Sequence, residues 1–229
     1  MSTTIDFTLE GRIERAPLTL TIESLVIAGW TGRDPVARDK HIAELETLGI
    51  ARPATVPIYY RAAGRRLTTA QGIECTGAES SGEVEFVLIA SGGAIYVGVG
   101  SDHTDRKVET YNITVSKQMC DKPIAPTLWR LEDVIDHWDA IVLRSFATID
   151  GKRMLYQEGT LAGMLPVQDL IAKGFDNATL PEGCALFGGT FAAMGGIRPA
   201  NRFDFEMEDP VLKRVIRHGY DIVELPVTG

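Results

Sequence analysis

The chain has 229 residues, of which 45% are hydrophobic and 24% are charged, an ordinary composition for a globular protein with a sizeable core. The net charge of −8 and the lack of a Lys/Arg-rich run exclude a nucleic-acid surface, and no apolar stretch approaches the roughly 20 residues of a membrane span. The N-terminal residues lack a signal-peptide pattern, and the three widely spaced cysteines suit a reducing compartment. We therefore expect a cytoplasmic protein without nucleic-acid or membrane partners.

Apolar alternation and turn signals predict the elements in chain order. Residues 4–10 and 18–30 form predicted strands, and residues 35–49 form an amphipathic helix that begins at a proline and ends at a glycine. Asp150-Gly151 lies between two alternating runs in 144–157 and predicts a hairpin. Short helices are predicted at 132–138 and 166–172. The other predicted strands are 56–60, 83–90, 94–99, 108–115, 180–190, 203–208 and 220–227. The predicted class is α+β, mainly β, with a few short helices and residues 1–23 as an N-terminal strand or arm.

Two glutamates stand at the start of an apolar strand. Because residues i and i+2 of a strand share a face, Glu83 and Glu85 point the same way, followed on that face by Val87 and Ile89. Two adjacent carboxylates in a partly buried place raise each other's pKa unless a cation lies between them, and Mg²⁺ or Mn²⁺ prefers such oxygen ligands. The alternative is an edge strand with both glutamates in solvent.

Two further constellations accompany this pair. Asp102 follows the next strand, one hairpin away, and either completes a set of oxygen ligands or closes the strand with an Asx-type turn. On the predicted helix, Glu44 lies three residues after His41, so its carboxylate can hydrogen-bond the imidazole. An imidazole oriented in this way can take a proton from water. Alternatively, the two are an ordinary surface pair.

In their order along the chain, these motifs resemble the fumarylacetoacetate hydrolase family. That family has an apolar strand, a D-H-x-x-E helix, a proline-flanked aromatic segment, an E-x-E strand, an N-D-V-S-A-R-D motif, a lysine with a proline-rich turn, and a G-T-P pattern. The matching segments here are SLVIAGW, DKHIAELE, VPIYYRAAGR, GEVEFVLIA, SDHTDRK, SK followed by KPIAP, and LPEGCALFGGTFAAMGG. The likeness covers roughly residues 24–227, which we expect to form the catalytic domain, 24–229.

Some positions depart from the family pattern. GRDPVAR lengthens the spacing before His41, Lys107 replaces the last aspartate of the N-D-V-S-A-R-D motif, and Phe191 replaces the proline after Thr190. The residues after Lys117 also differ. These departures indicate a divergent prokaryotic branch without an assigned substrate.

The resemblance implies a mixed β-sandwich roll and a role for each matching residue. Glu83, Glu85 and Asp102 would bind Mg²⁺ or Mn²⁺. His41, oriented by Glu44, would activate water, and a lid over 32–49 would carry it. The remaining implied site residues are Lys117 and Thr190, as oxyanion-stabilising groups, and Arg106 and Tyr60, as substrate-binding groups.

The function that the resemblance implies is hydrolysis of a carbon–carbon bond in a small anionic 1,3-dicarbonyl or acylpyruvate-type substrate. The same carboxylates would also serve a 2-oxo acid decarboxylase, another lyase or a tautomerase. A catalytically silent binding protein with this fold is a further alternative. The family also implies a homodimer.

Overall fold

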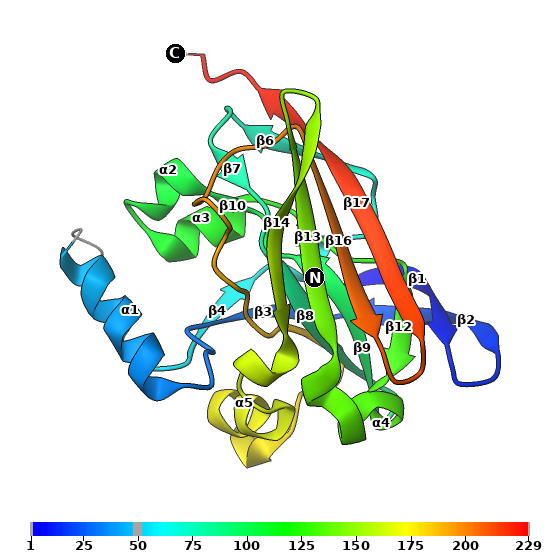
Figure 1. Ribbon diagram of the computed structural model, residues 1–229. Helices are drawn as coiled ribbons and strands as arrows, with labels where there is room; N and C mark the ends of the chain where they lie inside the picture. The colour runs from blue at the N-terminus through cyan, green and yellow to red at the C-terminus, as the bar shows by residue number, and fades with distance from the viewer. Residues whose placement is uncertain (1, 48–51, 229) are drawn as a thin grey trace.

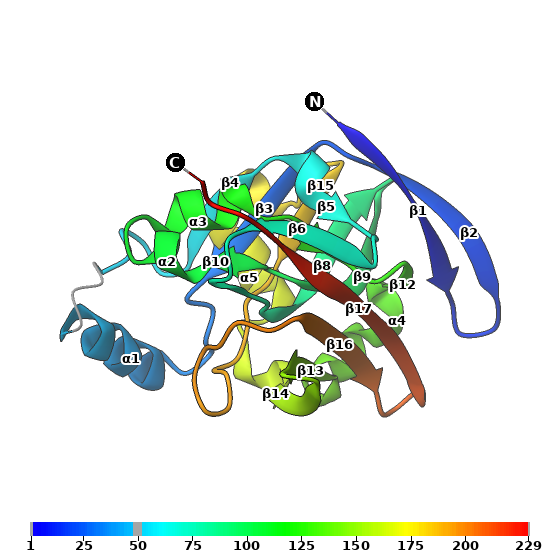
Figure 2. The ribbon, with the colours of Figure 1, turned by 90° about the horizontal axis from the view of Figure 1, so that it is seen from above.

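The computed structural model describes residues 2–47 and 52–228, and two β-sheets dominate it (Figures 1 and 2). Strands make up 47% of the residues and helices 21%, which confirms the predicted mainly-β class. The larger sheet has eight strands in the order β2-β1-β12-β9-β8-β15-β3-β4, and the smaller has five in the order β14-β13-β16-β17-β6. Among the described residues, no helix has the length and apolar character needed to cross a bilayer.

The eight-stranded sheet contains both parallel and antiparallel pairs. Its strands are β1 (Thr3–Glu10), β2 (Arg15–Ile22), β3 (Ser24–Gly29), β4 (Ile58–Ala62), β8 (Val84–Ser91), β9 (Ala94–Ser101), β12 (Thr127–Arg130) and β15 (Cys184–Phe187). The N-terminal hairpin β1–β2 joins this sheet because β1 pairs in parallel with β12. The division of the chain at residue 23 into an arm and a catalytic domain stays a prediction.

The five-stranded sheet is mostly antiparallel. Its strands are β6 (Gly72–Thr76), β13 (Val142–Ile149), β14 (Lys152–Thr160), β16 (Arg202–Asp209) and β17 (Arg214–Leu225). The short strands β5 (Leu67–Thr68), β7 (Ser80–Ser81), β10 (Thr104–Asp105) and β11 (Lys122–Pro123) form two small ribbons. The α-helices are α1 (Pro35–Thr47), α2 (Arg106–Glu109), α3 (Ile113–Met119), α4 (Leu131–Val134) and α5 (Val167–Gly174). Short 3₁₀ helices cover Gly64–Arg66, Ile135–Ala140, Leu161–Gly163 and Asp176–Ala178.

Strand β8 is apolar from Phe86 to Ala90 because it contributes to a hydrophobic core on each of its faces. Phe86 and Leu88 belong to the core shared with the five-stranded sheet, whereas Val87 and Ile89 belong to a second core shared with the N-terminal hairpin. A strand buried on both faces loses the alternation of a half-exposed one. Glu85 lies two residues before Val87 and therefore faces the same side of the sheet, the side of the second core.

The predicted strand over 108–115 is wrong, because the chain there forms α2 and α3. Both helices begin with a short polar side chain that caps the first turn. The Asp105 carboxylate accepts from the Val108 amide, and the Asn112 side chain accepts from the Val115 amide. These caps outweigh the β-propensity of the β-branched residues between them. By contrast, the hairpin predicted around Asp150-Gly151 is confirmed by β13 and β14.

The predicted helix over 35–49 is α1, whose last two predicted residues lie outside the described part of the chain. In Figures 1 and 2, α1 lies at one side of the molecule, apart from the two sheets. Its Ile42 is buried.

The turn between β8 and β9 gives a direct test of the fold. Gly92 and Gly93 both have positive φ, of 61° and 77°, and a Cβ at either position would meet nothing within 4 Å. Gly93→Val should therefore cost about 1–2 kcal/mol of unfolding free energy through backbone strain alone. Denaturant unfolding measures this loss. Gly93→Asn is the matched control and should cost less, because Asn tolerates the left-handed region; equal losses for the two variants would contradict the argument.

Candidate metal centre

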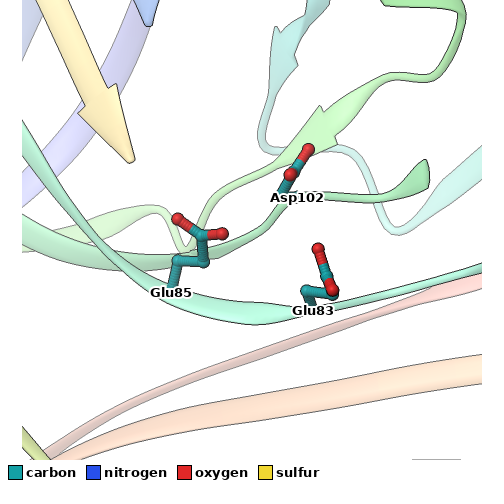
Figure 3. Close-up of side chains that lie close together, drawn as sticks. All are labelled: Glu83, Glu85 and Asp102. Carbon is teal, nitrogen blue, oxygen red and sulfur yellow. The ribbon is translucent and has the colours of Figure 1, made fainter. Parts of the chain in front are cut away.

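The β8–β9 hairpin brings three carboxylates together. Glu83 directly precedes β8, Glu85 lies in it, and Asp102 directly follows β9. Val84 pairs with Ser101, and the Asp102 amide donates to the Glu83 carbonyl at 2.9 Å, so the register continues one residue beyond the strands. One oxygen from each carboxylate lies within 4.8 Å of the others, and the three side chains extend to the same side (Figure 3). The structure thus places the three predicted metal ligands in one cluster.

Burial makes this cluster costly when no cation is bound. Glu85 is 2% exposed and Asp102 is fully buried. Burial, and then the neighbouring Asp102 carboxylate, raise the pKa of Glu85 well above its ordinary value. One oxygen of Glu85 accepts from the Gly189 amide at 2.7 Å, which offsets part of this cost. The site therefore favours a positive charge beside Glu85.

Two buried lysines flank Asp102. The Lys117 ammonium donates to Asp102 Oδ2 and lies 3.6 Å from Glu83, while the Lys122 ammonium lies 3.3 Å from Asp102 Oδ1. Burial alone would raise the pKa of Asp102, but Lys117 and Lys122 together outweigh it and lower that pKa. The same carboxylates raise the pKa of Lys117 despite its burial. Asp102 and Lys117 are accordingly charged at neutral pH.

Lys122 is a site residue that the sequence reasoning missed. Its side chain is fully buried, and its ammonium donates to the carbonyls of His103 and Cys120 at 2.6 and 3.2 Å. A lysine beside a proline in KPIAP gives no periodic signal of burial. The parallel pairing of β11 with β5 holds Lys122 in place, with its ammonium beside the Asp102 carboxylate.

Arg106 lies at the site with its guanidinium already engaged. It donates to Ser81 at 2.7 Å and to Glu109 at 2.8 Å, and it lies 3.2 Å from Glu83. Burial would lower the pKa of Arg106, but Glu83 and Glu109 raise it. In this arrangement the arginine orients a carboxylate of the cluster.

Thr190 contacts the backbone beside the cluster, and Tyr60 lies near Lys117. The Thr190 hydroxyl donates to the Val84 carbonyl at 2.7 Å, so its proton is directed to the backbone of β8 between Glu83 and Glu85. The Tyr60 ring, on β4, lies 5.8 Å from the Lys117 ammonium. Burial raises the pKa of Tyr60, which keeps its hydroxyl protonated.

The predicted water-activating pair lies on α1. The backbone of α1 carries both His41 and Glu44, which occupy the predicted i and i+3 positions of the helix. Their side chains lie outside the part of the chain that the structure describes. Their predicted role stays a prediction.

The donor set fits a hard divalent cation. All three potential ligands are carboxylate oxygens, the type that Mg²⁺ and Mn²⁺ prefer. The Asp102 Oδ1 atom is buried and accepts no hydrogen bond from the described residues, although a lysine ammonium lies nearby. A buried carboxylate oxygen without a donor is uncommon, and such an oxygen suits coordination of a cation.

Comparison with known proteins places the chain in a family. Residues 28–220 match a family model described as "Protein of unknown function (DUF2848)". The chain belongs to the DUF2848 family. No curated protein matches the sequence of this DUF2848 chain.

Solved structures show the fold of the DUF2848 chain. A yeast fumarylacetoacetate hydrolase family protein, ynq8, is similar with a TM-score of 0.62 and 17% identity, over 90% of this chain and 95% of that one. The fumarylacetoacetate hydrolase of Exiguobacterium antarcticum gives 0.60 and 16%, over 92% and 82%. A 2-keto-3-deoxy-D-arabinonate dehydratase complexed with magnesium and 2,5-dioxopentanoate gives 0.64 and 13%, over 90% and 74%. The DUF2848 chain therefore has the fumarylacetoacetate hydrolase fold, as the sequence resemblance predicts.

The burial of Glu85 makes a prediction about stability. Glu85→Gln should raise the unfolding free energy of the metal-free protein at neutral pH by about 1 kcal/mol or more, because the folded wild type must hold a buried charge or take up a proton. For a domain of this size, Tm rises by about 2–4 °C per kcal/mol. The gain should disappear as the pH falls to the ordinary glutamate pKa of 4.5, where the unfolded chain is protonated too. Thermal unfolding between pH 4.5 and 7.5 measures it.

Glu83→Gln is the matched control. Glu83 is paired with Arg106 and Lys117, so the same substitution there should lower Tm. A lower Tm for metal-free Glu85→Gln at pH 7 would contradict the prediction.

Proposed function

We propose that this protein is a divalent-metal-dependent hydrolase that cleaves a carbon–carbon bond in a small anionic 1,3-dicarbonyl or acylpyruvate-type substrate. The observation that carries the proposal is the cluster of Glu83, Glu85 and Asp102, two of them buried, in which Asp102 Oδ1 accepts no hydrogen bond from the part of the chain that the structure describes. The fold supports it, since structures with this fold include a hydrolase and a magnesium-bound dehydratase.

The three carboxylates would hold Mg²⁺ or Mn²⁺. When bound, the ion supplies Lewis acidity that polarises the carbonyl oxygens of an oxo acid. Glu83 and Glu85 hold their relative positions through the backbone of β8, and the Glu83–Asp102 backbone hydrogen bond keeps Asp102 opposite them. Ionised Glu85 is required for this role, so metal binding should release a proton near neutral pH.

The charge balance favours an anionic substrate. Glu83, Glu85 and Asp102 contribute −3 when ionised, and Lys117, Lys122 and Arg106 contribute +3. A divalent ion raises this sum to +2, and Glu109 beside Arg106 lowers it to +1. Lys117 also stabilises negative charge that develops on the departing carbon fragment.

The proposed hydrolytic step uses the helix α1. His41, oriented by Glu44, takes a proton from water as the water oxygen bonds to the substrate carbonyl carbon. The carbon–carbon bond then breaks, its electron pair remains on the departing enolate, and the imidazolium returns the proton to that carbon. We propose that α1 acts as a lid that excludes other water during this step.

A lyase reaction on a 2-oxo acid is the second candidate. The magnesium-bound dehydratase of the same fold favours it, because its bound compound is an oxo acid. Decarboxylation or tautomerisation would use the same carboxylates with different proton donors. Arg106 Nε and Nη1 and the Thr190 hydroxyl already donate to other groups, so acid–base groups from α1 would decide the reaction.

We further propose that the protein acts in the cytoplasm as a homodimer. Unpaired edges of the eight-stranded sheet, at β2 and β4, are surfaces at which two copies could pair.

The metal centre can be tested by calorimetry. Wild type should bind Mn²⁺ or Mg²⁺ at one site per chain and release protons on binding, measured in buffers of different ionisation enthalpy. Glu85→Gln should weaken binding more than about 100-fold, because even outer-sphere partners of metal ligands are worth 10–100-fold. Lys107→Gln is a control, since Lys107 is exposed on α2 and contacts Glu79 instead of the cluster. Equal binding by wild type and Glu85→Gln would exclude this site.

The reaction can be tested with a panel of acylpyruvates, oxaloacetate and other 2-oxo acids. Turnover should require the metal and be abolished by chelation. His41→Ala should lower kcat by about 10²–10⁴-fold, the usual contribution of a general base, while Mn²⁺ affinity stays unchanged. Products separated by chromatography distinguish hydrolysis from decarboxylation or dehydration. A metal-loaded protein without turnover on the whole panel would favour a binding protein instead.

A further inference from the structure

Gln157 is a fully buried amide whose hydrogen bonds converge on the strand that carries the cluster. Its side-chain oxygen accepts from the Val84 amide and the Ser145 hydroxyl, both at 2.9 Å. Its nitrogen donates to the Thr190 hydroxyl at 2.8 Å and to the Phe191 carbonyl at 2.6 Å. These four bonds use the whole capacity of a carboxamide, two donors and two acceptors. Its orientation is thereby fixed.

Val84, Gln157 and Thr190 form a closed ring of hydrogen bonds that includes both backbone groups of Val84. The Val84 amide donates to Gln157, Gln157 donates to Thr190, and Thr190 donates to the Val84 carbonyl. Val84 lies between Glu83 and Glu85. Any shift or rotation of its backbone therefore moves one or both of the carboxylates.

The ring replaces a neighbouring strand that is absent at this point of the sheet. β15 pairs with β8 only opposite Val87, Leu88 and Ile89. Beyond it, Gly188 donates to the Phe86 carbonyl, and Gly189, with φ of 108°, turns its amide to the Glu85 carboxylate. The chain thus leaves the ladder just before Val84, and the side chains of Thr190 and Gln157 take over the backbone pairing.

An irregularity in β14 directs Gln157 inward. In the pairing with β13, Ser145 lies opposite Gln157, whereas the next residue, Phe146, lies opposite Leu155. Tyr156 is therefore the extra residue of a β-bulge, and both Tyr156 and Gln157 are buried although they are consecutive. Regular alternation would send one of them to solvent, and bulges commonly redirect a side chain in this way.

We propose that Gln157 is a positioning residue for the metal centre: together with Thr190 it holds both backbone groups of Val84 and so sets the placement of Glu83 and Glu85. This inference rests on the proposed function, because it assumes that the cluster binds a metal. Gln157 contacts none of the three carboxylates in the hydrogen bonds that it makes. It acts through the backbone of β8.

The test measures Mn²⁺ affinity by calorimetry and the electron paramagnetic resonance spectrum of the bound ion. Gln157→Leu keeps a side chain of similar size without its hydrogen bonds, and Thr190→Val keeps the shape without the hydroxyl. Each should weaken Mn²⁺ binding by at least about tenfold. This is the lower limit of the roughly 10–100-fold effect of residues that support metal ligands without contacting the metal. Each should also broaden the spectrum of the ion that still binds. The double variant should lose less than the product of the two single losses, because both act on one ring.

Tyr156→Phe is the matched control. It removes the hydroxyl of the buried residue next to Gln157 in β14. That oxygen accepts a hydrogen bond from the Arg198 amide at 3.0 Å and takes no part in the ring of hydrogen bonds around Val84. It should lower Tm and leave the Mn²⁺ affinity and spectrum unchanged. This separates a general loss of stability from an effect on the site.

The outcomes distinguish the two hypotheses. If wild type fails to bind Mn²⁺, the proposed function and this inference are both wrong. If wild type binds and the folded Gln157→Leu and Thr190→Val variants bind within twofold of it, only the positioning role is wrong. If Gln157→Leu does not fold, Thr190→Val alone decides in the same way.

Discussion

The central constraint on this molecule is the repulsion among three carboxylates that the β8–β9 hairpin holds within 4.8 Å of one another, two of them buried. Such a cluster would not persist without compensation. Lys117 and Lys122 neutralise Asp102, Arg106 engages Glu83, and the Gly189 amide supports Glu85. The compensation is uneven, because Glu85 has no contacting cation among the described residues. The uncompensated charge of Glu85 thus lowers the stability of the metal-free fold at the position where a metal ion would stabilise it most.

Local sequence signals predicted much of the fold. The Asp150-Gly151 hairpin and the ligand-bearing strands follow from alternation and turn residues, and the resemblance supplied the order of the motifs. Where two local signals competed, the prediction was wrong: over 108–115, β-branched residues suggested a strand, but the caps at Asp105 and Asn112 decided for helices. Propensity is a weak prior when a cap satisfies the backbone.

The candidate site was predictable only in part, because its members differ in how they reach it. The carboxylates lie on one hairpin, so spacing along the chain allowed their convergence, and the family resemblance predicted it. Lys122 reaches the site through the long-range pairing of β11 with β5, and Gln157 reaches it through the β-bulge in the β13–β14 hairpin; neither has a periodic signature. A buried lysine or glutamine is rare enough that composition argues against it. Val84, a hydrogen-bond partner of Gln157, lies over 70 residues from it along the chain, so this contact is apparent only in the folded structure.

The bulge at Tyr156 has a consequence for how variation in this family should be aligned. In the present pairing Leu155 lies opposite Phe146 and Gln157 lies opposite Ser145, so a chain that lacks Tyr156 would keep both pairs in a regular ladder, with Gln157 still facing inward. The one-residue gap of such a chain therefore belongs at Tyr156. Placed C-terminal to Gln157, the same gap would align the glutamine of that chain with Tyr156 and conceal its place beside the carboxylate cluster.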